Sequence, residues 1–260
     1  MKIVSICNQK GGVGKTTTAI TLAAFLALNG KKTLLVDLDP QGNTTSGLGI
    51  DKSALERSVY DALVDAGQIQ SSIISTQVNG LSLLPSNIHL TGAEVELVNE
   101  IGRESKLKKA LHALQNAYDF VIIDCPPSLG LLTLNALTGS NSVLIPIQCE
   151  FYAMEGLSQL VKTIELVRDN LNPKLEIEGI LMTMADNRTN LTDQVVKEIR
   201  SHFPDKVYKT IIPRSIKMGE APGFGKPIML YDKNCVGCKK YEEFTQEFLV
   251  HTPKSLIMNN

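Results

Sequence analysis

The sequence has no apolar segment long enough to cross a bilayer and no excess of either charge. No run approaches the roughly 18 consecutive apolar residues of a membrane-spanning helix, and the 260 residues carry a formal net charge of -1. Residues 1–8 contain one lysine and a β-branched run that leads into a glycine-rich loop, which predicts a first strand rather than a secretion signal. We therefore expect a cytoplasmic protein without a membrane partner, in which any nucleic-acid contact is a local patch.

Cysteine is scarce, and its count is odd. Five cysteines in a chain without an export signal argue against a disulfide framework. Cys235 and Cys238 have the spacing of a metal-binding or redox pair, but the sequence offers no second pair or histidines at suitable spacing. Free thiols are the favoured interpretation of these two residues, and a metal or redox role is the alternative.

The order of apolar segments predicts an α/β fold. Continuous apolar runs suit parallel strands that are covered on both faces, and segments with helical spacing, such as residues 16–29 and 157–171, lie between them. This alternation indicates a doubly wound, mostly parallel sheet with helices on both faces. We expect one domain over residues 1–250 and a flexible tail over residues 251–260. The predicted strands are residues 2–7, 32–39, 81–85, 119–126, 142–148, 177–184 and 206–213.

A glycine-rich loop connects the first predicted strand to the first predicted helix, which is the setting that a phosphate-binding loop requires. Its glycines let backbone N–H groups converge on phosphate oxygens, Lys15 can reach the β and γ phosphates, and the Thr16 hydroxyl can bind Mg²⁺. The sequence therefore predicts MgATP as the ligand. The expected phosphate-binding residues are Lys10, Gly11, Gly12, Val13, Gly14, Lys15, Thr16 and Thr17.

Three aspartates follow predicted strands at the edge where this loop lies. Asp37 and Asp39 end the second strand, and strand periodicity places them on one face. Asp124 ends the run FVIID and matches the acidic residue that holds Mg²⁺ in phosphate-loop enzymes. Alone, such residues could be solvated strand ends, but beside a phosphate loop they predict a functional site in which Thr16 and Asp124 hold the metal.

The loop departs from the general pattern G-x-x-x-x-G-K-[ST], because Gln9 stands where the first glycine is expected and a second lysine, Lys10, follows. The run K-G-G-V-G-K-T-T resembles the deviant Walker A motif of the ParA/MinD branch of P-loop NTPases. Resemblance to Soj-type ParA proteins extends over residues 2–233 through DPQGNTTSGLGI, DCPPSLGLLTLNALT, IPIQCEFYAMEGLSQL and GKPIMLYD. The segment CVGCKKYEEFTQEF departs from that family.

The resemblance implies specific roles around the phosphates. Lys10 would reach across an ATP-bound homodimer to the nucleotide of the partner subunit, which would make it catalytic together with Lys15. Asp39 would orient the attacking water, and Asp37 would help to hold the loop and the metal shell. Glu150 would contact the ribose of the partner's nucleotide.

The resemblance also implies a base pocket. The segment IPRS ends at Ser215 and is similar to the family segment IPRN, whose proline and asparagine contact adenine, so Pro213 and Ser215 are expected to bind the base. A serine in place of asparagine offers only a shorter hydroxyl group.

The function that the resemblance implies is a DNA-partitioning ATPase that binds DNA non-specifically as an ATP dimer and is released when a ParB-type centromere-binding protein stimulates hydrolysis. Residues 186–240 hold eleven lysines and arginines against six acids, a net charge of +5, which leaves -6 for the remainder. Arg188 and Lys217 fall where Soj relatives carry DNA-contacting arginines. A MinD-like membrane-cycling regulator and an iron–sulfur ATPase remain the alternatives.

Overall fold

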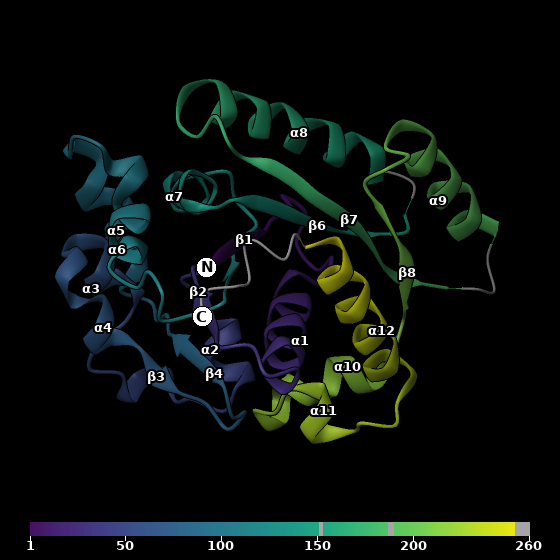
Figure 1. Ribbon diagram of the computed structural model, residues 1–260, viewed down its shortest axis with the longest axis horizontal. Helices are drawn as coiled ribbons and strands as arrows, with labels where there is room; N and C mark the ends of the chain where they lie inside the picture. Colours follow the sequence, from purple (N-terminus) through teal and green to yellow (C-terminus); the bar gives the residue numbers. More distant parts are fainter. Residues whose placement is uncertain (151–152, 187–189, 253–260) are drawn as a thin grey trace.

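A single sheet forms the centre of the computed structural model, which describes residues 1–150, 153–186 and 190–252. Within those residues it has eight strands in the order β3-β4-β2-β5-β1-β6-β7-β8 (Figure 1). All neighbouring strands pair in parallel except β3, which pairs antiparallel with β4. The strands are β1 Lys2–Ile6, β2 Thr33–Asp37, β3 Ile74–Ser75, β4 Leu81–Leu84, β5 Phe120–Asp124, β6 Ser142–Gln148, β7 Glu176–Ala185 and β8 Val207–Pro213.

Helices cover both faces of this sheet, which confirms the predicted doubly wound α/β fold. One apolar core lies under α1 and α12, and a second lies on the opposite face under helices that include α7 and α8 (Figure 1). The helices are α1 Lys15–Leu28, α2 Asn43–Gly47, α3 Val59–Val64, α4 Ile69–Ser72, α5 Leu90–Glu96, α6 Lys106–His112, α7 Leu131–Gly139, α8 Ala153–Asn170, α9 Asn190–His202, α10 Ile216–Glu220, α11 Ile228–Tyr231 and α12 Val236–His251.

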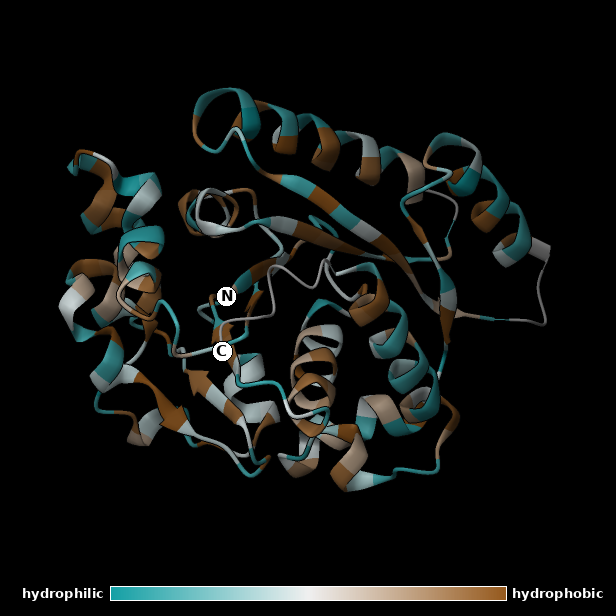
Figure 2. Cartoon of the chain, in the orientation of Figure 1, coloured by the Kyte–Doolittle hydropathy of each residue, from teal (hydrophilic) through white to brown (hydrophobic). Residues whose placement is uncertain are grey.

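The central strands contribute side chains to both cores, because successive residues of a strand point to opposite faces. In β5, Val121 and Ile123 belong to one core, whereas Phe120 and Ile122 belong to the other. Figure 2 shows apolar segments concentrated on the strands, while polar and apolar segments alternate along α8. This two-sided burial explains why the strands appear in the sequence as continuous apolar runs.

The last described residues belong to the folded body. Helix α12 packs against α1 and β8 and ends at His251. The next residue, Thr252, is 3% exposed, and its hydroxyl oxygen accepts a hydrogen bond from Lys2 Nζ at 3.1 Å. Residues 251 and 252 are therefore described together with the folded body, whereas residues 253–260 of the predicted tail lie outside the described residues, so the tail stays a prediction. No helix in the described part of the chain is long and apolar enough to span a bilayer.

Three parallel strands, β2, β5 and β1, lie side by side and end at the same edge of the sheet. Asp37 at the end of β2 is in register with Asp124 at the end of β5, and Asp124 is in register with Ile6 at the end of β1. Ligands of open α/β sheets bind outside the carboxyl ends of the strands. The fold therefore places both aspartates at the edge from which the glycine-rich loop begins.

Candidate functional site

The glycine-rich loop wraps around the start of α1 after leaving β1. Gly12 and Gly14 have φ values of 76° and 89°, a backbone region in which glycine carries little steric cost. Gly14 is the N-cap of α1, and Lys15 is the first helical residue. The N–H groups of the first helical turn are not used within the helix, so they and the helix dipole form a binding site for anions.

Side chains from neighbouring segments hold this loop in place. Asn8 accepts a hydrogen bond from the Lys10 N–H at 2.9 Å and donates one to the Pro146 carbonyl oxygen at 2.8 Å. On the other side, the Thr183 hydroxyl donates to the Val13 carbonyl oxygen at 2.8 Å. These bonds tie the loop to β6 and β7, so the anion site is organised before a ligand binds.

Lys15 extends back over the loop. Its ammonium is largely buried and donates one of its three protons to the Lys10 carbonyl oxygen at 3.1 Å. Burial lowers the pKa of Lys15, while the nearby Asp124 carboxylate opposes that change. A buried ammonium with a single neutral acceptor gains from an anionic oxygen, which is the role predicted for Lys15 at the phosphates.

Asp124 forms the centre of a polar cluster at the end of β5. Its Oδ2 accepts hydrogen bonds from the hydroxyls of Thr16 and Thr44, both at 2.8 Å, while its buried Oδ1 has no partner among the described residues. Burial raises the pKa of Asp124 to about 6. An unpartnered carboxylate oxygen beside a hydroxyl matches the oxygen ligands that Mg²⁺ prefers.

Mg²⁺ therefore fits these residues, with Thr16 and Asp124 as the side chains that would hold it. No group of three His, Cys, Asp or Glu side chains that could hold a metal occurs among the described residues. The other ligands of such a Mg²⁺ ion would be phosphate oxygens and water. Thr44 was not predicted, because its role depends on a contact with Asp124 across 80 positions of sequence.

Asp37 makes contacts that fix the start of α2. It is fully buried and accepts hydrogen bonds from the Thr45 N–H at 2.8 Å, the Thr45 hydroxyl at 2.7 Å and the Asp39 N–H at 3.2 Å. Burial and the neighbouring Asp124 charge raise the pKa of Asp37 to about 7. These contacts support a loop-holding role, whereas the metal role of Asp37 stays a prediction.

Asp39 lies beyond the end of β2, which the structure places at Asp37. The second strand therefore ends two residues earlier than predicted, and Asp39 belongs to the segment that follows it rather than to the strand. Asp39 is 8% exposed, and its Oδ1 accepts the Gln41 N–H at 2.9 Å. The Asp39 carboxylate slightly opposes the lowering of the pKa of the buried Lys15, and its water-orienting role stays a prediction.

Lys10 and Glu150 form an ion pair within the chain. Their side chains are 47% and 43% exposed, so the pair is worth at most about 1 kcal/mol. Both predicted cross-dimer residues thus lie together on the surface beside the loop. Their contacts with a partner subunit's nucleotide stay predictions.

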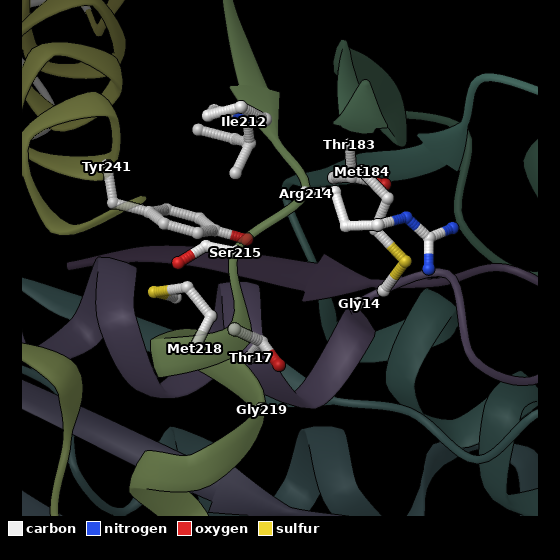
Figure 3. Close-up of a pocket in the computed structure, with 11 residues that line it drawn as sticks. Gly14, Thr17, Thr183, Met184, Ile212, Arg214, Ser215, Met218, Gly219 and Tyr241 are labelled. Carbon is white, nitrogen blue, oxygen red and sulfur yellow. The ribbon is translucent and has the colours of Figure 1, made fainter. Parts of the chain in front are cut away.

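A pocket of about 170 Å³ lies beside the loop, between α1, β7, β8 and α12 (Figure 3). The predicted base-binding residues Pro213 and Ser215 both line it, next to Gly14 of the loop. Met184 also lines the pocket. Its φ is 51°, an uncommon backbone conformation for a residue other than glycine. Pockets for whole small molecules measure about 300–1,000 Å³, so this one suits a single ring system.

Sequence reasoning missed most of the other residues that line this pocket, among them Met218 and Tyr241. Met218 from α10 and Tyr241 from α12 contribute side chains to the wall that Figure 3 shows on the side of Ser215. The Tyr241 hydroxyl is 2.8 Å from the Thr18 hydroxyl of α1, which links the wall to the helix that follows the loop. No local motif marks these residues, because segments that are far apart in the sequence, among them α1, β7, β8, α10 and α12, assemble the pocket.

The two predicted DNA-binding residues have different outcomes. Lys217 is on α10 with a side chain that is 48% exposed, and its Nζ donates to Glu220 at 3.0 Å. The hydrogen bond with Glu220 raises the pKa of Lys217, so the lysine stays charged but already has an acidic partner. Arg188 lies outside the described residues.

A glycine loop between a first strand and helix, with an acidic residue ending a neighbouring parallel strand, defines the class of P-loop nucleotide-binding proteins. A family model described as an AAA domain matches residues 1–177. The chain is 57% identical over 246 residues to the sporulation initiation inhibitor protein Soj of Bacillus subtilis, which covers 95% of this chain and 97% of the relative. The chain belongs to the ParA/Soj family of P-loop ATPases.

Two other similarities are to a second Soj protein and to a nucleotide-bound structure. The chromosome-partitioning ATPase Soj of Treponema pallidum is 52% identical and covers 95% of this chain and 97% of the relative. Among solved structures, cobyrinic acid a,c-diamide synthase from Mycobacterium smegmatis with bound ATP analog and magnesium has a TM-score of 0.85 at 39% identity, with 96% of this chain and 95% of that chain covered.

Proposed function

We propose that this protein is an ATP-hydrolysing DNA-partitioning protein. ATP would place its phosphates over residues 10–17 and its base in the pocket of Pro213, Ser215 and Met218. Lys15 would bind the β and γ phosphates, and Asp39 would orient the attacking water. Mg²⁺, held by Thr16 and Asp124, would supply positive charge at the phosphate oxygens.

The unpartnered Oδ1 of Asp124, next to the Thr16 hydroxyl and the ordered loop, carries this proposal. A buried carboxylate oxygen without a hydrogen bond is costly unless a ligand satisfies it. The shared fold supports nucleotide binding but not a particular reaction. The partitioning role is supported by the name of the Treponema pallidum relative, a chromosome-partitioning ATPase that is more similar to this chain, at 52% identity, than the mycobacterial structure is at 39%.

Hydrolysis would require an ATP-bound homodimer in which Lys10 acts on the partner's nucleotide. The exposed position of Lys10 beside the loop supports this role, since a side chain that acts across an interface has to lie at the surface. Lys10→Ala should retain ATP binding by the monomer and lose roughly 10³-fold of partner-stimulated hydrolysis. Steady-state phosphate release and ATP affinity would be measured together, and unaltered stimulated turnover would reject the role of Lys10.

The ATP dimer would bind DNA without sequence preference and would be released on hydrolysis stimulated by a ParB-type partner, within the cytoplasm. The net charge of +5 over residues 186–240 supports a DNA-binding face. DNA affinity should be measured with ATP, with ADP and without nucleotide at two salt concentrations. We expect tight DNA binding only in the presence of ATP. Salt should weaken it, so that the logarithm of the affinity falls with the logarithm of the salt concentration with a slope of about -0.9 per neutralised phosphate. Equal affinity in all three nucleotide states would contradict the cycle.

A MinD-like membrane cycle requires a free amphipathic helix near the C-terminus. In α12 the apolar residues Tyr241, Phe244 and Phe248 are buried in the protein's own core. Glu247 also accepts hydrogen bonds from the N–H groups of Lys209 and Thr210 on the edge strand β8. These contacts favour the partitioning function, and ATP-dependent sedimentation with liposomes, without DNA binding, would reverse that preference.

A further inference from the structure

The pair Cys235 and Cys238 begins the last helix and has no part in the nucleotide chemistry described above. Cys235 is the N-cap of α12, and Cys238 lies in its first turn. The Cys238 N–H donates a hydrogen bond to Cys235 Sγ at 3.3 Å. This bond holds the first sulfur directly over the residue with which it would form a disulfide.

The two thiols differ in access to solvent. Cys235 is partly exposed, whereas Cys238 is 3% exposed, and burial raises the pKa of Cys238 to about 11. In redox pairs of this spacing, the accessible sulfur is attacked or attacks first, and the buried sulfur completes the exchange. Cys235 is also placed at the N-terminus of a helix of 16 residues, whose dipole favours negative charge on the attacking atom.

The other cysteines do not offer such a site. Cys7 Sγ and Cys125 Sγ are 3.1 Å apart, but each residue is only 1% exposed in the sheet next to the glycine loop. Cys149 is also buried and has no thiol partner among the described residues. An oxidant in solution therefore reaches Cys235 most readily.

We propose that Cys235 and Cys238 form a thiol–disulfide switch that reacts with low-molecular-weight disulfides and controls the neighbouring nucleotide pocket. Cys235 attacks one sulfur of the oxidant, whose S–S bond breaks; a mixed disulfide forms, and the released thiol takes the proton that Cys235 loses. Cys238 then attacks Cys235 Sγ and displaces the second thiol, which takes the Cys238 proton. Two protein thiols are oxidised to one disulfide, and one small disulfide is reduced to two thiols.

Contacts of the first turn of α12 connect this pair to the pocket. A Cβ atom placed on Gly237 would lie 2.6 Å from Cγ of Met218 and 3.3 Å from Cβ of Ser215. Both Met218 and Ser215 line the pocket, as does Tyr241, one turn after Cys238 (Figure 3). The first turn of α12 therefore has no space for even one added carbon against Met218, and a shift of this turn on formation of the S–S bond would move the pocket wall.

The chemical part is tested on the full chain without nucleotide. The protein is equilibrated with glutathione and glutathione disulfide at increasing ratios, free thiols are alkylated, and peptides are identified by mass spectrometry. We expect a disulfide between Cys235 and Cys238, absent from the Cys235→Ser variant, which retains a capping oxygen. Full alkylation of both residues in excess glutathione disulfide, or glutathione retained on Cys235, would overturn the switch.

The regulatory part rests on the proposed nucleotide site and is tested by ATP affinity. Oxidised wild-type protein should bind ATP at least about 5-fold more weakly than reduced wild-type protein. Cys235→Ser should have the same ATP affinity under oxidising and reducing conditions. Equal affinities for the two wild-type forms would overturn control of the pocket. Failure of both forms to bind ATP would instead reject the proposed function, since the disulfide is detected independently of nucleotide.

Discussion

The phosphate end and the base end of the candidate site are constructed differently. At the phosphate end, the loop and the aspartates are fixed by hydrogen bonds that include Asn8, Thr183 and Thr45. At the base end, the wall consists largely of packed side chains such as Met218 and Tyr241 from different segments. The comparison teaches that hydrogen bonds hold the side chains of the phosphate end within narrow limits, whereas packing alone shapes most of the wall at the base end.

This difference predicts which substitutions affect every ligand with phosphates and which affect only ligands with a base. ATP and inorganic tripolyphosphate share the phosphate chain but not the base. Affinities for the two ligands therefore separate the contributions of the two ends.

Lys15→Ala should have the largest effect. Loss of a preorganised cation at the phosphates should lower hydrolysis by roughly 10²–10³-fold and weaken ATP and tripolyphosphate together. Phosphate release and calorimetric titration would measure both effects. Lys162→Ala, on the exposed surface of α8, is the control that should change neither hydrolysis nor binding. If Lys15→Ala weakened binding of ATP but not of tripolyphosphate, the assignment of Lys15 to the phosphate end would be contradicted.

Asp124→Asn should have the next largest effect. The amide keeps the size of the side chain and an acceptor for Thr16 and Thr44, but it removes the negative charge that favours Mg²⁺. We expect hydrolysis to fall by about 10²-fold and the Mg²⁺ concentration at half-maximal rate to rise. Asp205→Asn, at an exposed position, is the matched control, and an unchanged Mg²⁺ requirement in Asp124→Asn would count against the metal site.

The features that could be predicted from the sequence are those that leave a local pattern of residues. The seven longer strands were predicted because burial on both faces produces continuous apolar runs, whereas the two residues of β3 are too few to produce a pattern. Lys15 and Thr16 could be predicted because a phosphate loop requires fixed spacing, and Asp124 could be predicted because it ends an apolar run. Asp39 was misplaced relative to its strand because the sequence does not show where pairing ends.

Residues that act through long-range contacts were not recognised. Thr44 and Thr45 bond to aspartates on two different strands, and Tyr241 reaches Thr18 across 223 positions. Such contacts depend on the packing of helices on the sheet, which local periodicity does not specify. Pro213 and Ser215 were found by resemblance to a family segment rather than from any chemical pattern of their own.

Met218→Ala should separate the two ends of the site. Removing part of a nearly buried side chain from the pocket wall should weaken ATP binding by about 5–10-fold through lost apolar contact. Binding of tripolyphosphate should stay unchanged, because Met218 does not line the glycine loop. The control is Ile216→Ala on the same helix, where the side chain is 80% exposed; equal losses for both ligands in Met218→Ala would show that the two ends are not independent.

The smallest effect concerns the stability of the nucleotide-free protein, and it arises at the phosphate end alone. The pKa of Asp37 is raised from 3.8 to about 7 in the folded state, so between these values the folded protein retains a proton that the unfolded chain has lost. Stability must then fall as pH rises from about 4 to 7 and level off above that range. Asp124, with a pKa raised to about 6, acts in the same direction.

Thermal unfolding without nucleotide should therefore give a lower Tm at pH 8 than at pH 5.5, and Asp37→Asn should reduce that difference. Each pKa unit corresponds to about 1.4 kcal/mol, and 1 kcal/mol shifts Tm by about 2–4 °C in a protein of this size. The Tm difference between pH 5.5 and pH 8 should therefore be smaller in the variant than in wild type by at least about 2–4 °C. Subtracting the variant's profile of Tm against pH from the wild-type profile removes the contributions of titrating groups that both proteins share. An identical pH dependence would mean that Asp37 is already charged in the folded state and that its bonds to Thr45 outweigh its burial.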